Sequence, residues 1–210
     1  MRLRLFNTPV FQPGPVRGDG LLLRFPVTDD FAAWRALREE SAEFLRPWEP
    51  RWPADDLTRH GFRRRLARYR RDASENCGFT YFLFDEAGET LLGGLSLSNI
   101  RMGAARSCSL GYWMGERHAG QGHMRRAVRL ILPEAFGPMG MERIEAGCIP
   151  SNTRSTRLLE SVGFVREGIM RGYLEIDGRR QDHVLHAMLR RDHEALLQQG
   201  DRPKAASIGA

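Results

Sequence analysis

The hydrophobic residues of the chain recur with two different periods, which predicts a mixture of strands and helices. Short alternating or continuous apolar runs indicate strands, and apolar residues three or four positions apart indicate amphipathic helices. Strands are predicted at residues 21–26, 79–84, 91–98, 107–114, 143–149, 172–176 and 182–189. Helices are predicted to begin near Thr28, Asp55, Gly122 and Asn152, and a short one follows residue 189. This order of elements predicts a mixed α/β or α+β domain around one sheet.

Glycines and prolines mark the ends of these elements. Residues 1–20 end in Gly-Asp-Gly and are predicted to be a loosely ordered arm, and residues 190–210 a short helix and a tail, so the domain spans 21–189. Residues 44–53 contain three prolines and two tryptophans and are predicted to form an ordered loop, because proline interrupts helices. For the same reason we expect Pro133 to kink or shorten the helix that begins at Gly122.

The length and composition are those of one globular domain. The chain has 210 residues, of which 41% are hydrophobic and 28% charged. No run approaches the roughly eighteen apolar residues of a membrane-spanning helix, and prolines interrupt the N-terminal segment where a signal peptide needs an apolar core. Cys77, Cys108 and Cys148 are odd in number and widely spaced. They fit reduced thiols in a cytoplasmic protein better than a disulfide framework or a zinc site.

The charge adds a first indication of a partner. A formal net charge of +6 favours an anionic one, such as nucleic acid, a ribosome, a membrane surface or a phosphorylated ligand. Lys204 is the only lysine among 32 basic residues, a skew that genome composition also produces. Seven arginines between Arg59 and Arg71 form either a docking surface or a solvated helix face, and no recognised nucleic-acid motif accompanies them. Charge alone does not decide between these partners.

The segment 113–125, WMGERHAGQGHMR, is the most informative part of the chain. A strand ends here, a loop with Gly120 and Gly122 follows, and a helix begins. Glycines let a ligand approach the backbone, and a helix start offers unpaired N–H groups, so the segment suits a pyrophosphate, with Arg117 and His123 as further donors. Two glycines in a simple turn are the alternative. The segment is not a P-loop, because GxxxxGK[ST] is missing, and it is not GxGxxG, because Arg125 stands at the third glycine position.

Two blocks of sequence resemble the GNAT acetyltransferase superfamily. Residues Arg117–Gly122 match its R/Q-x-x-G-x-G/A signature at a strand-to-helix junction, and Glu145–Phe164 resembles its next strand, Asn-headed helix and closing Gly-Phe. Within the superfamily the chain is most similar to ribosomal-protein-alanine N-acetyltransferases. The features shared with them are the loop Arg46–Pro50, the strand Leu110–Trp113 and the N-x-x-S pattern of Asn152 and Ser155.

This resemblance implies a fold, a co-substrate and a binding site. The fold is a single GNAT-like domain with a central, mostly antiparallel, splayed sheet flanked by helices, and the co-substrate is acetyl-CoA, with no metal. The reaction is direct attack of an amine on the thioester, which needs a neutral amine, oxyanion donors and a proton for the leaving thiolate. The residues implied to bind acetyl-CoA are Trp113 and Met114 through their backbone, then Arg117, His118, Ala119, Gly120, Gln121, Gly122, His123 and Asn152.

Three residues are candidates for catalysis. Ser155 shares a helix face with Leu158 and Leu159 and is expected to point into the ligand cleft, where it or a water protonates the thiolate. Many relatives use a tyrosine on this helix, but Leu159 stands at that position. Glu145 and Glu49 are candidates for the general base, and each has the alternative role of a structural ion-pair partner.

Other polar and aromatic residues have weaker functional interpretations. His183 and His186 face opposite sides of an alternating strand, so they do not predict a metal site. Tyr112 either stacks or hydrogen-bonds near the substrate or is a core tyrosine, and the second interpretation is favoured. Trp48 and Trp52 either line a peptide-entry groove or pack the loop that carries them.

The acceptor is expected to be a protein N-terminus, with alanine or serine of a ribosomal protein as the leading case. Deprotonating a lysine near pH 7.4 costs about 4 kcal/mol, whereas an α-amine with a pKa of about 7.7–8.0 costs well under 1, so an N-terminal acceptor needs little help from a base. The alternatives are a small amine such as an antibiotic or metabolite, a non-catalytic acyl-CoA sensor, and a nucleic-acid-binding protein. We expect a monomer or dimer without DNA or membrane partners, and docking of the arginine-rich helix on the ribosome is a hypothesis.

Overall fold

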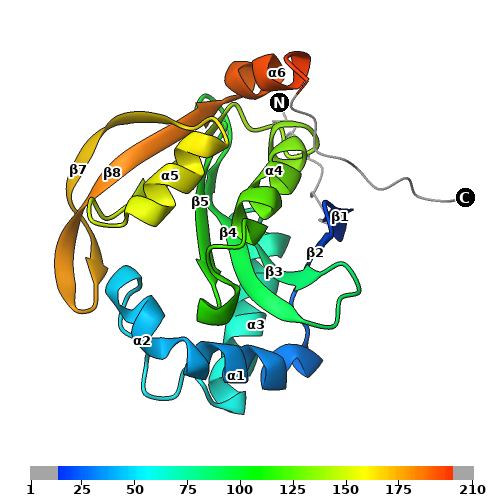
Figure 1. The fold of residues 1–210 in the computed structure, drawn as a ribbon, viewed down its shortest axis with the longest axis vertical. Coiled ribbons are helices and arrows are strands. Elements are labelled where there is room, and N and C mark those ends of the chain that lie inside the picture. Colours follow the sequence, from blue (N-terminus) through cyan, green and yellow to red (C-terminus); the bar gives the residue numbers. More distant parts are fainter. Residues whose placement is uncertain (1–13, 201–210) are drawn as a thin grey trace, which may run out of the picture.

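The computed structural model describes residues 14–200, and at its centre lies one eight-stranded sheet with the order β1-β2-β3-β4-β5-β6-β8-β7 (Figure 1). The strands are β1 (Val16–Gly18), β2 (Leu21–Arg24), β3 (Phe79–Asp85), β4 (Leu91–Arg101), β5 (Ser107–Met114), β6 (Arg143–Cys148), β7 (Val165–Ile176) and β8 (Arg179–Leu189). Neighbouring strands run antiparallel except β5 and β6, which are parallel. The predicted α+β class with a mostly antiparallel sheet is confirmed.

Helices cover both faces of this sheet (Figure 1). They are α1 (Phe31–Glu40), α2 (Ala42–Leu45), α3 (Arg59–Ser74), α4 (His123–Phe136), α5 (Thr153–Ser161) and α6 (Arg190–Gln198), with 3-10 turns at Thr28–Asp30, Arg46–Trp48 and Glu116–His118. The helices α1 and α3 lie on one face and α4 on the other, with α5 next to α4 and β6. Within residues 14–200 no helix is long and apolar enough to cross a membrane.

The alternation of side chains along the strands divides the core into two layers. On β2, Leu21 and Leu23 pack on the side of α4, whereas Leu22 packs on the side of α1 and α3. On β3, Tyr81 belongs to the first layer and Phe82 to the second. Burying side chains of this size stabilises the fold by about 1.5–3 kcal/mol each. Because both faces of the sheet are covered, an opening for a ligand requires a break in the sheet itself.

Such a break lies between the two parallel strands. β5 pairs with β6 only from Ser107 to Ser109, opposite Arg143 to Glu145. Beyond these residues the strands diverge, although β5 continues to Met114 and β6 to Cys148. Backbone groups on the facing edges therefore lack a partner strand. The predicted splay of the sheet is confirmed, and the register places it between the second half of β5 and the end of β6.

The N-terminal boundary of the sheet differs from the prediction. The arm was expected to extend to residue 20, but Val16–Gly18 forms β1 and pairs with Leu21–Leu23 of β2. Asp19 and Gly20 make the hairpin turn with positive φ angles of 52° and 73°. The Gly-Asp-Gly sequence is therefore part of a two-residue turn inside the sheet. The rest of the predicted arm, residues 1–13, lies outside the described residues, as does the tail 201–210.

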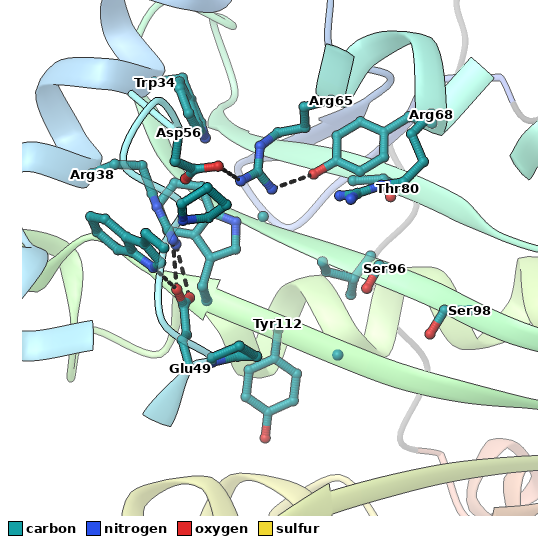
Figure 2. A pocket seen from close by; sticks show the side chains of 18 of the residues that line it. Trp34, Arg38, Glu49, Asp56, Arg65, Arg68, Thr80, Ser96, Ser98 and Tyr112 are labelled. Atoms are coloured by element: carbon teal, nitrogen blue, oxygen red, sulfur yellow. Dashed lines mark hydrogen bonds and ion pairs between the residues drawn. The ribbon is translucent and has the colours of Figure 1, made fainter. Parts of the chain in front are cut away.

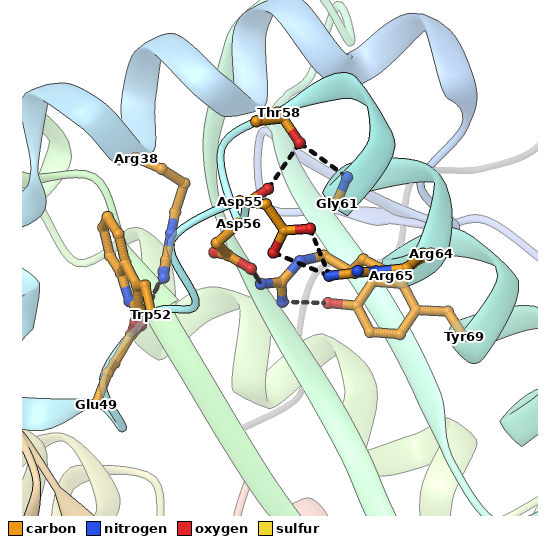
Figure 3. Close-up of polar contacts among 10 residues, drawn as sticks. All are labelled: Arg38, Glu49, Trp52, Asp55, Asp56, Thr58, Gly61, Arg64, Arg65 and Tyr69. Carbon is orange, nitrogen blue, oxygen red and sulfur yellow. Dashed lines mark hydrogen bonds and ion pairs between the residues drawn. The ribbon is translucent and has the colours of Figure 1, made fainter.

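Two further boundaries differ for local reasons. Helix α3 was expected to begin at Asp55, but its N-cap is Thr58, whose hydroxyl accepts a hydrogen bond from Gly61 N at 3.0 Å (Figure 3). Strand β7 begins at Val165 rather than near residue 172, because irregular register at Gly168 and at Leu174 interrupts its alternation. Such bulges interrupt the alternation of apolar and polar residues by which a strand is recognised in a sequence.

Candidate active site

Two cavities meet at strand β5. The first, which we call the outer cavity, has a volume of about 530 Å³ and lies among α1, the loop 49–53, α3 and the sheet (Figure 2). The second, the inner cavity, has a volume of about 200 Å³ and lies in the splay, between β5, β6 and α5. Pro50, Gly111 and Tyr112 line both cavities. A ligand in the outer cavity therefore approaches the splay past Tyr112.

The inner cavity is lined by groups from several elements, and no Asp, Glu, Lys or Arg is among them. They include Leu110 and Tyr112 of β5, Ala146 and Cys148 of β6, Ser155 of α5, Leu174 of β7 and His183 of β8. The hydroxyl groups of Tyr112 and Ser155 form a hydrogen bond of 2.6 Å, in which either oxygen can donate. Burial raises the pKa of Tyr112, so its hydroxyl keeps its proton at neutral pH. This pair can supply a proton to a group that becomes negatively charged inside the splay.

Helix α5 holds Ser155 in position through its N-cap. The side-chain oxygen of Asn152 accepts a hydrogen bond of 3.1 Å from Ser155 N, as an N-cap does. Asn152 also lines the inner cavity. Its side-chain NH₂ donates no hydrogen bond to another described residue, so it is available to a ligand.

The glycine loop forms an anion-binding start of helix α4. Gly120 and Gly122 both have φ angles of +77°, and Gly122 is the N-cap. A Cβ atom built on either glycine meets nothing within 4 Å, so open space faces the loop. Among residues 14–200, the backbone N–H groups from Gly120 to Arg125 have no acceptor. Unpaired N–H groups beside open space at a helix start are suited to a phosphate group.

The side chains of this loop are held by one another. Arg117 lies 3.4 Å from a Glu40 oxygen and donates to His118 Nε2 at 3.0 Å. His123 contacts Gln121 at 3.1 Å, and its Nδ1 lies 2.8 Å from a guanidinium nitrogen of Arg126. Partial burial lowers the pKa of both histidines, and the adjacent guanidinium groups lower it further. Both imidazoles are therefore neutral at pH 7, and the positive charge of the loop resides on arginine.

The outer cavity contains a buried arginine between two indole rings. Arg38, 5% exposed, donates to both carboxylate oxygens of Glu49, at 2.8 and 2.5 Å (Figures 2 and 3). Trp52 Nε1 donates to the same carboxylate at 2.8 Å. The guanidinium lies 4.1 Å from the Trp52 ring and 4.9 Å from the Trp113 ring. This cluster fixes the loop 49–53 to α1 and β5.

A second charged cluster forms the opposite wall. Arg65 donates to Asp56 at 2.5 Å and to the Tyr69 hydroxyl at 3.1 Å (Figure 3). Its guanidinium lies 5.3 Å from the Trp34 ring. In Figure 2 the Tyr112 ring points away from this cluster, toward the splay. The two least exposed arginines of the outer cavity, Arg38 and Arg65, are thus each paired with a carboxylate.

Comparison with known proteins identifies the family. Residues 20–165 match the family described as the acetyltransferase (GNAT) domain. The chain belongs to the GNAT acetyltransferases. It is 33% identical over 172 residues to the ribosomal protein uS5-alanine N-acetyltransferase of Escherichia coli K12, covering 81% of this chain and 88% of that protein. The resemblance to ribosomal-protein-alanine N-acetyltransferases is confirmed at this level.

Solved GNAT structures agree. Mycobacterium smegmatis RimJ in complex with CoA-disulfide has a TM-score of 0.80 at 30% identity, covering 89% of this chain and 93% of that one. The ribosomal-protein-S5-alanine acetyltransferase from Vibrio fischeri has a TM-score of 0.79 at 28% identity, covering 86% of this chain and 98% of that one. GNAT enzymes use acetyl-CoA. The open glycine loop and the unpaired edge of β5 fit such a ligand.

The two candidate bases of this GNAT chain lie in ion pairs. Glu145 accepts from Arg143 at 2.8 Å and from Arg101 at 3.4 Å, and it lines neither cavity. Glu49 lines the outer cavity, but Arg38 and Trp52 occupy both of its oxygens. These contacts favour the second role considered for both carboxylates, that of a structural ion-pair partner.

Aromatic residues contribute more to the site than the sequence suggested. Tyr112 combines both interpretations, because its ring packs against the core while its hydroxyl contacts Ser155 in the inner cavity. Trp48 lines the inner cavity and Trp52 the outer one, which favours the groove-lining role over loop packing alone. The Trp113 ring faces the outer cavity, so only its backbone lies at the edge of the splay. Within the described chain, no three His, Cys, Asp or Glu residues are grouped as a metal site.

Proposed function

We propose that this GNAT enzyme acetylates the N-terminal α-amine of a protein, with a ribosomal protein as the leading case. The observation that carries this proposal is the meeting of the two cavities at Tyr112. The inner cavity is small and uncharged, as a thioester requires, and the outer cavity of about 530 Å³ has room for the first residues of a peptide. The names of the Escherichia coli and Vibrio fischeri relatives give ribosomal protein S5 alanine as their acceptor, which supports the same class.

In this proposal acetyl-CoA lies along the splay. Its pyrophosphate is bound by the N–H groups of Gly120–His123, with Arg117 released from Glu40 as a further donor. The pantetheine chain follows the unpaired edge of β5, where the backbone of Trp113 and Met114 lies, and reaches Asn152. The acetyl group then lies in the inner cavity beside Tyr112 and Ser155.

The Tyr112–Ser155 pair supplies the proton for the leaving sulfur. The amine attacks the thioester carbonyl carbon, the carbon–sulfur bond breaks, and the thiolate receives a proton from one of the two hydroxyls. Burial keeps the Tyr112 hydroxyl protonated before the reaction by raising its pKa, and its hydrogen bond with Ser155 lets one proton replace the other. Backbone N–H groups at the edge of β5 are suited to stabilise the oxyanion.

A thiol-release assay with an alanine-starting peptide tests the proposal. We expect turnover with the free N-terminus and none when the same peptide is N-terminally blocked and keeps an internal lysine. Equal turnover of both peptides would falsify the N-terminal assignment. Turnover only with small primary amines would support a metabolite or antibiotic acetyltransferase. Binding of acetyl-CoA without turnover of any amine would support a sensor.

The same assay on ribosomal particles tests whether helix α3 docks on the ribosome. Arg64 pairs with Asp55 at 2.8 Å and Arg68 lies over the Tyr69 ring, whereas Arg63 is exposed and has no ion pair with a described residue. If α3 docks on the ribosome, neutralising Arg63 and Arg64 lowers activity on the particle and leaves activity on the free peptide unchanged. Arg68 is kept in this variant because it lines the outer cavity. An equal loss on both substrates would contradict docking.

A further inference from the structure

A histidine of strand β8 faces the inner cavity and has no role in the scheme above. His183 is 2% exposed and lines the inner cavity together with Tyr112 and Ser155. Its position on the strand places it on the opposite face from Val184 and His186, which lie toward α5 and Cys148. His183 shares the lining of this cavity with Trp48 and with Pro50, which also lines the outer cavity.

The hydrogen bonding of this imidazole decides which nitrogen is free. His183 Nδ1 lies 3.1 Å from the carbonyl oxygen of Gln181. A carbonyl oxygen only accepts, so Nδ1 carries the proton, and Nε2 of the neutral ring presents a lone pair. The Nε2 atoms of His186 and His193 are sealed from solvent without a partner among residues 14–200, whereas that of His183 is not sealed in this way.

The neighbouring strand leaves room for this ring. Gly147 of β6 lies beside it, and a Cβ atom on Gly147 would lie 3.2 Å from Met170 Cε and 3.6 Å from His183 Cβ. The Tyr173 ring packs edge-on against the imidazole with 5.4 Å between centroids. These contacts hold the ring in one orientation at the wall of the cavity.

We propose that His183 Nε2 accepts the proton of the incoming ammonium group, directly or through one water. This proposal rests on the proposed function, because it assumes a primary amine acceptor. The two carboxylates considered as bases, Glu49 and Glu145, are both held in ion pairs. The other titratable groups around the ring are Tyr173 of β7, Tyr112 of β5 and Cys148 of β6, together with Asp182, which accepts from Gly172 N.

The protons balance in this scheme. The ammonium gives one proton to His183 Nε2 and becomes the nucleophile. When its nitrogen bonds to the thioester carbon and the carbon–sulfur bond breaks, a second proton from the nitrogen replaces the one that the Tyr112–Ser155 pair has given to the thiolate. His183 then releases its proton to solvent. The sum is one amide, one free thiol and one proton.

The pH dependence of kcat/KM for the peptide tests this role. An α-amine with a pKa of about 8 is about one-tenth neutral at pH 7. If His183 acts as the base, kcat/KM of the wild type stays nearly level between pH 7 and 8. The kcat/KM of His183→Gln instead rises with pH, in proportion to the fraction of the peptide amine that is neutral. We expect His183→Gln to be about tenfold slower at pH 7 and within about twofold of wild type at pH 9. Added imidazole should restore His183→Ala at pH 7.

His193→Gln is the matched control, because His193 is also a buried histidine but stacks on Phe136, outside both cavities. It should keep the wild-type profile. A deficit in His183→Gln that is equal at all pH values indicates a structural role and overturns the proposal. The proposal is also overturned if kcat/KM of the wild type itself rises with pH in proportion to the neutral fraction of the amine. If the enzyme acetylates only another primary amine, the proposed function fails and the same profiles with that amine still test His183.

Discussion

The two cavities that meet at Tyr112 are lined by different kinds of side chain. The inner cavity is bordered by strand edges and neutral side chains, and it exists because β5 and β6 pair only as far as Ser109 and Glu145. The outer cavity is bordered by charged side chains from α1, α3 and the segment 49–56, and among them Arg38 pairs with Glu49 and Arg65 with Asp56.

This difference separates chemistry from recognition. In the inner cavity few atoms act, so one missing hydroxyl is expected to affect the rate of the chemical step and little else. In the outer cavity the ion pairs shape a wall, so a missing partner is expected to affect the stability of the fold and the binding of the acceptor.

Removing the inner hydroxyl pair is expected to have the largest effect. Tyr112→Phe and Ser155→Ala should each lower kcat by about a hundred- to a thousandfold, the usual range for loss of a proton donor. Because the two hydroxyls act as one unit, the double variant should be little slower than the slower single variant. Thiol release under saturating acetyl-CoA measures kcat.

The separation also requires that these variants still bind acetyl-CoA. Its dissociation constant, measured by calorimetry, should change by less than about twofold, since the hydroxyls contact no phosphate in the proposed arrangement. Wild-type turnover in Ser155→Ala would leave Tyr112 as the donor. Wild-type turnover in both variants would remove the pair from the mechanism.

Removing Arg38 is expected to affect the outer cavity. Arg38→Met leaves the carboxylate of Glu49, 20% exposed, without its bidentate partner. Loss of one member of a buried pair costs about 3–5 kcal/mol, and the partial exposure of Glu49 places the expected loss near 3. Chemical denaturation measures this loss. The KM for the peptide should rise more than kcat falls, because the loop with Trp52 loses its anchor.

Arg35→Met is the control on the same helix. Arg35 is half exposed and lies 3.5 Å from Glu39, so its loss should cost less than about 0.5 kcal/mol. If Arg38→Met is as stable as Arg35→Met and keeps its KM, the buried pair does not hold the wall of the outer cavity.

The sequence predicted the backbone of the inner cavity better than its side-chain contacts. The glycine spacing, the Asn152 cap and the alternating strands are local patterns, and all three are present in the structure. The contact between Tyr112 and Ser155 joins residues 43 positions apart, and it depends on where β5 leaves β6. Alternation groups Tyr112 with Leu110, so the local pattern indicates a core residue, and only the splay exposes its hydroxyl.

The outer cavity could not be derived from local patterns at all. Glu49 was a candidate base because carboxylates are basic, but its environment is set by Arg38, Trp52 and the packing of α1. Glu145 likewise alternates to an open strand face, where Arg143 and Arg101 neutralise it. Arg38–Glu49 and Arg101–Glu145 follow from tertiary packing, and no spacing marks them in the sequence. Arg143 and Glu145 do share a strand face through their i, i+2 spacing.

The glycine loop tests whether an effect on ligand binding can be separated from an effect on stability, because its glycines provide both the backbone conformation and the proposed ligand contact. Gly122→Ala places a methyl group where a phosphate is proposed to bind and strains a residue with a φ of +77°, which costs about 1 kcal/mol of stability. We expect the KM for acetyl-CoA to rise about tenfold, since a charge-assisted hydrogen bond contributes about 1.5–3 kcal/mol.

Gly103→Ala provides the matched control, because Gly103 has a φ of +68° and equal open space, but lies between β4 and β5, away from both cavities. It should lose the same stability with no change in KM. If both variants change KM equally, the loss reflects general strain and the glycine loop is not where the pyrophosphate binds.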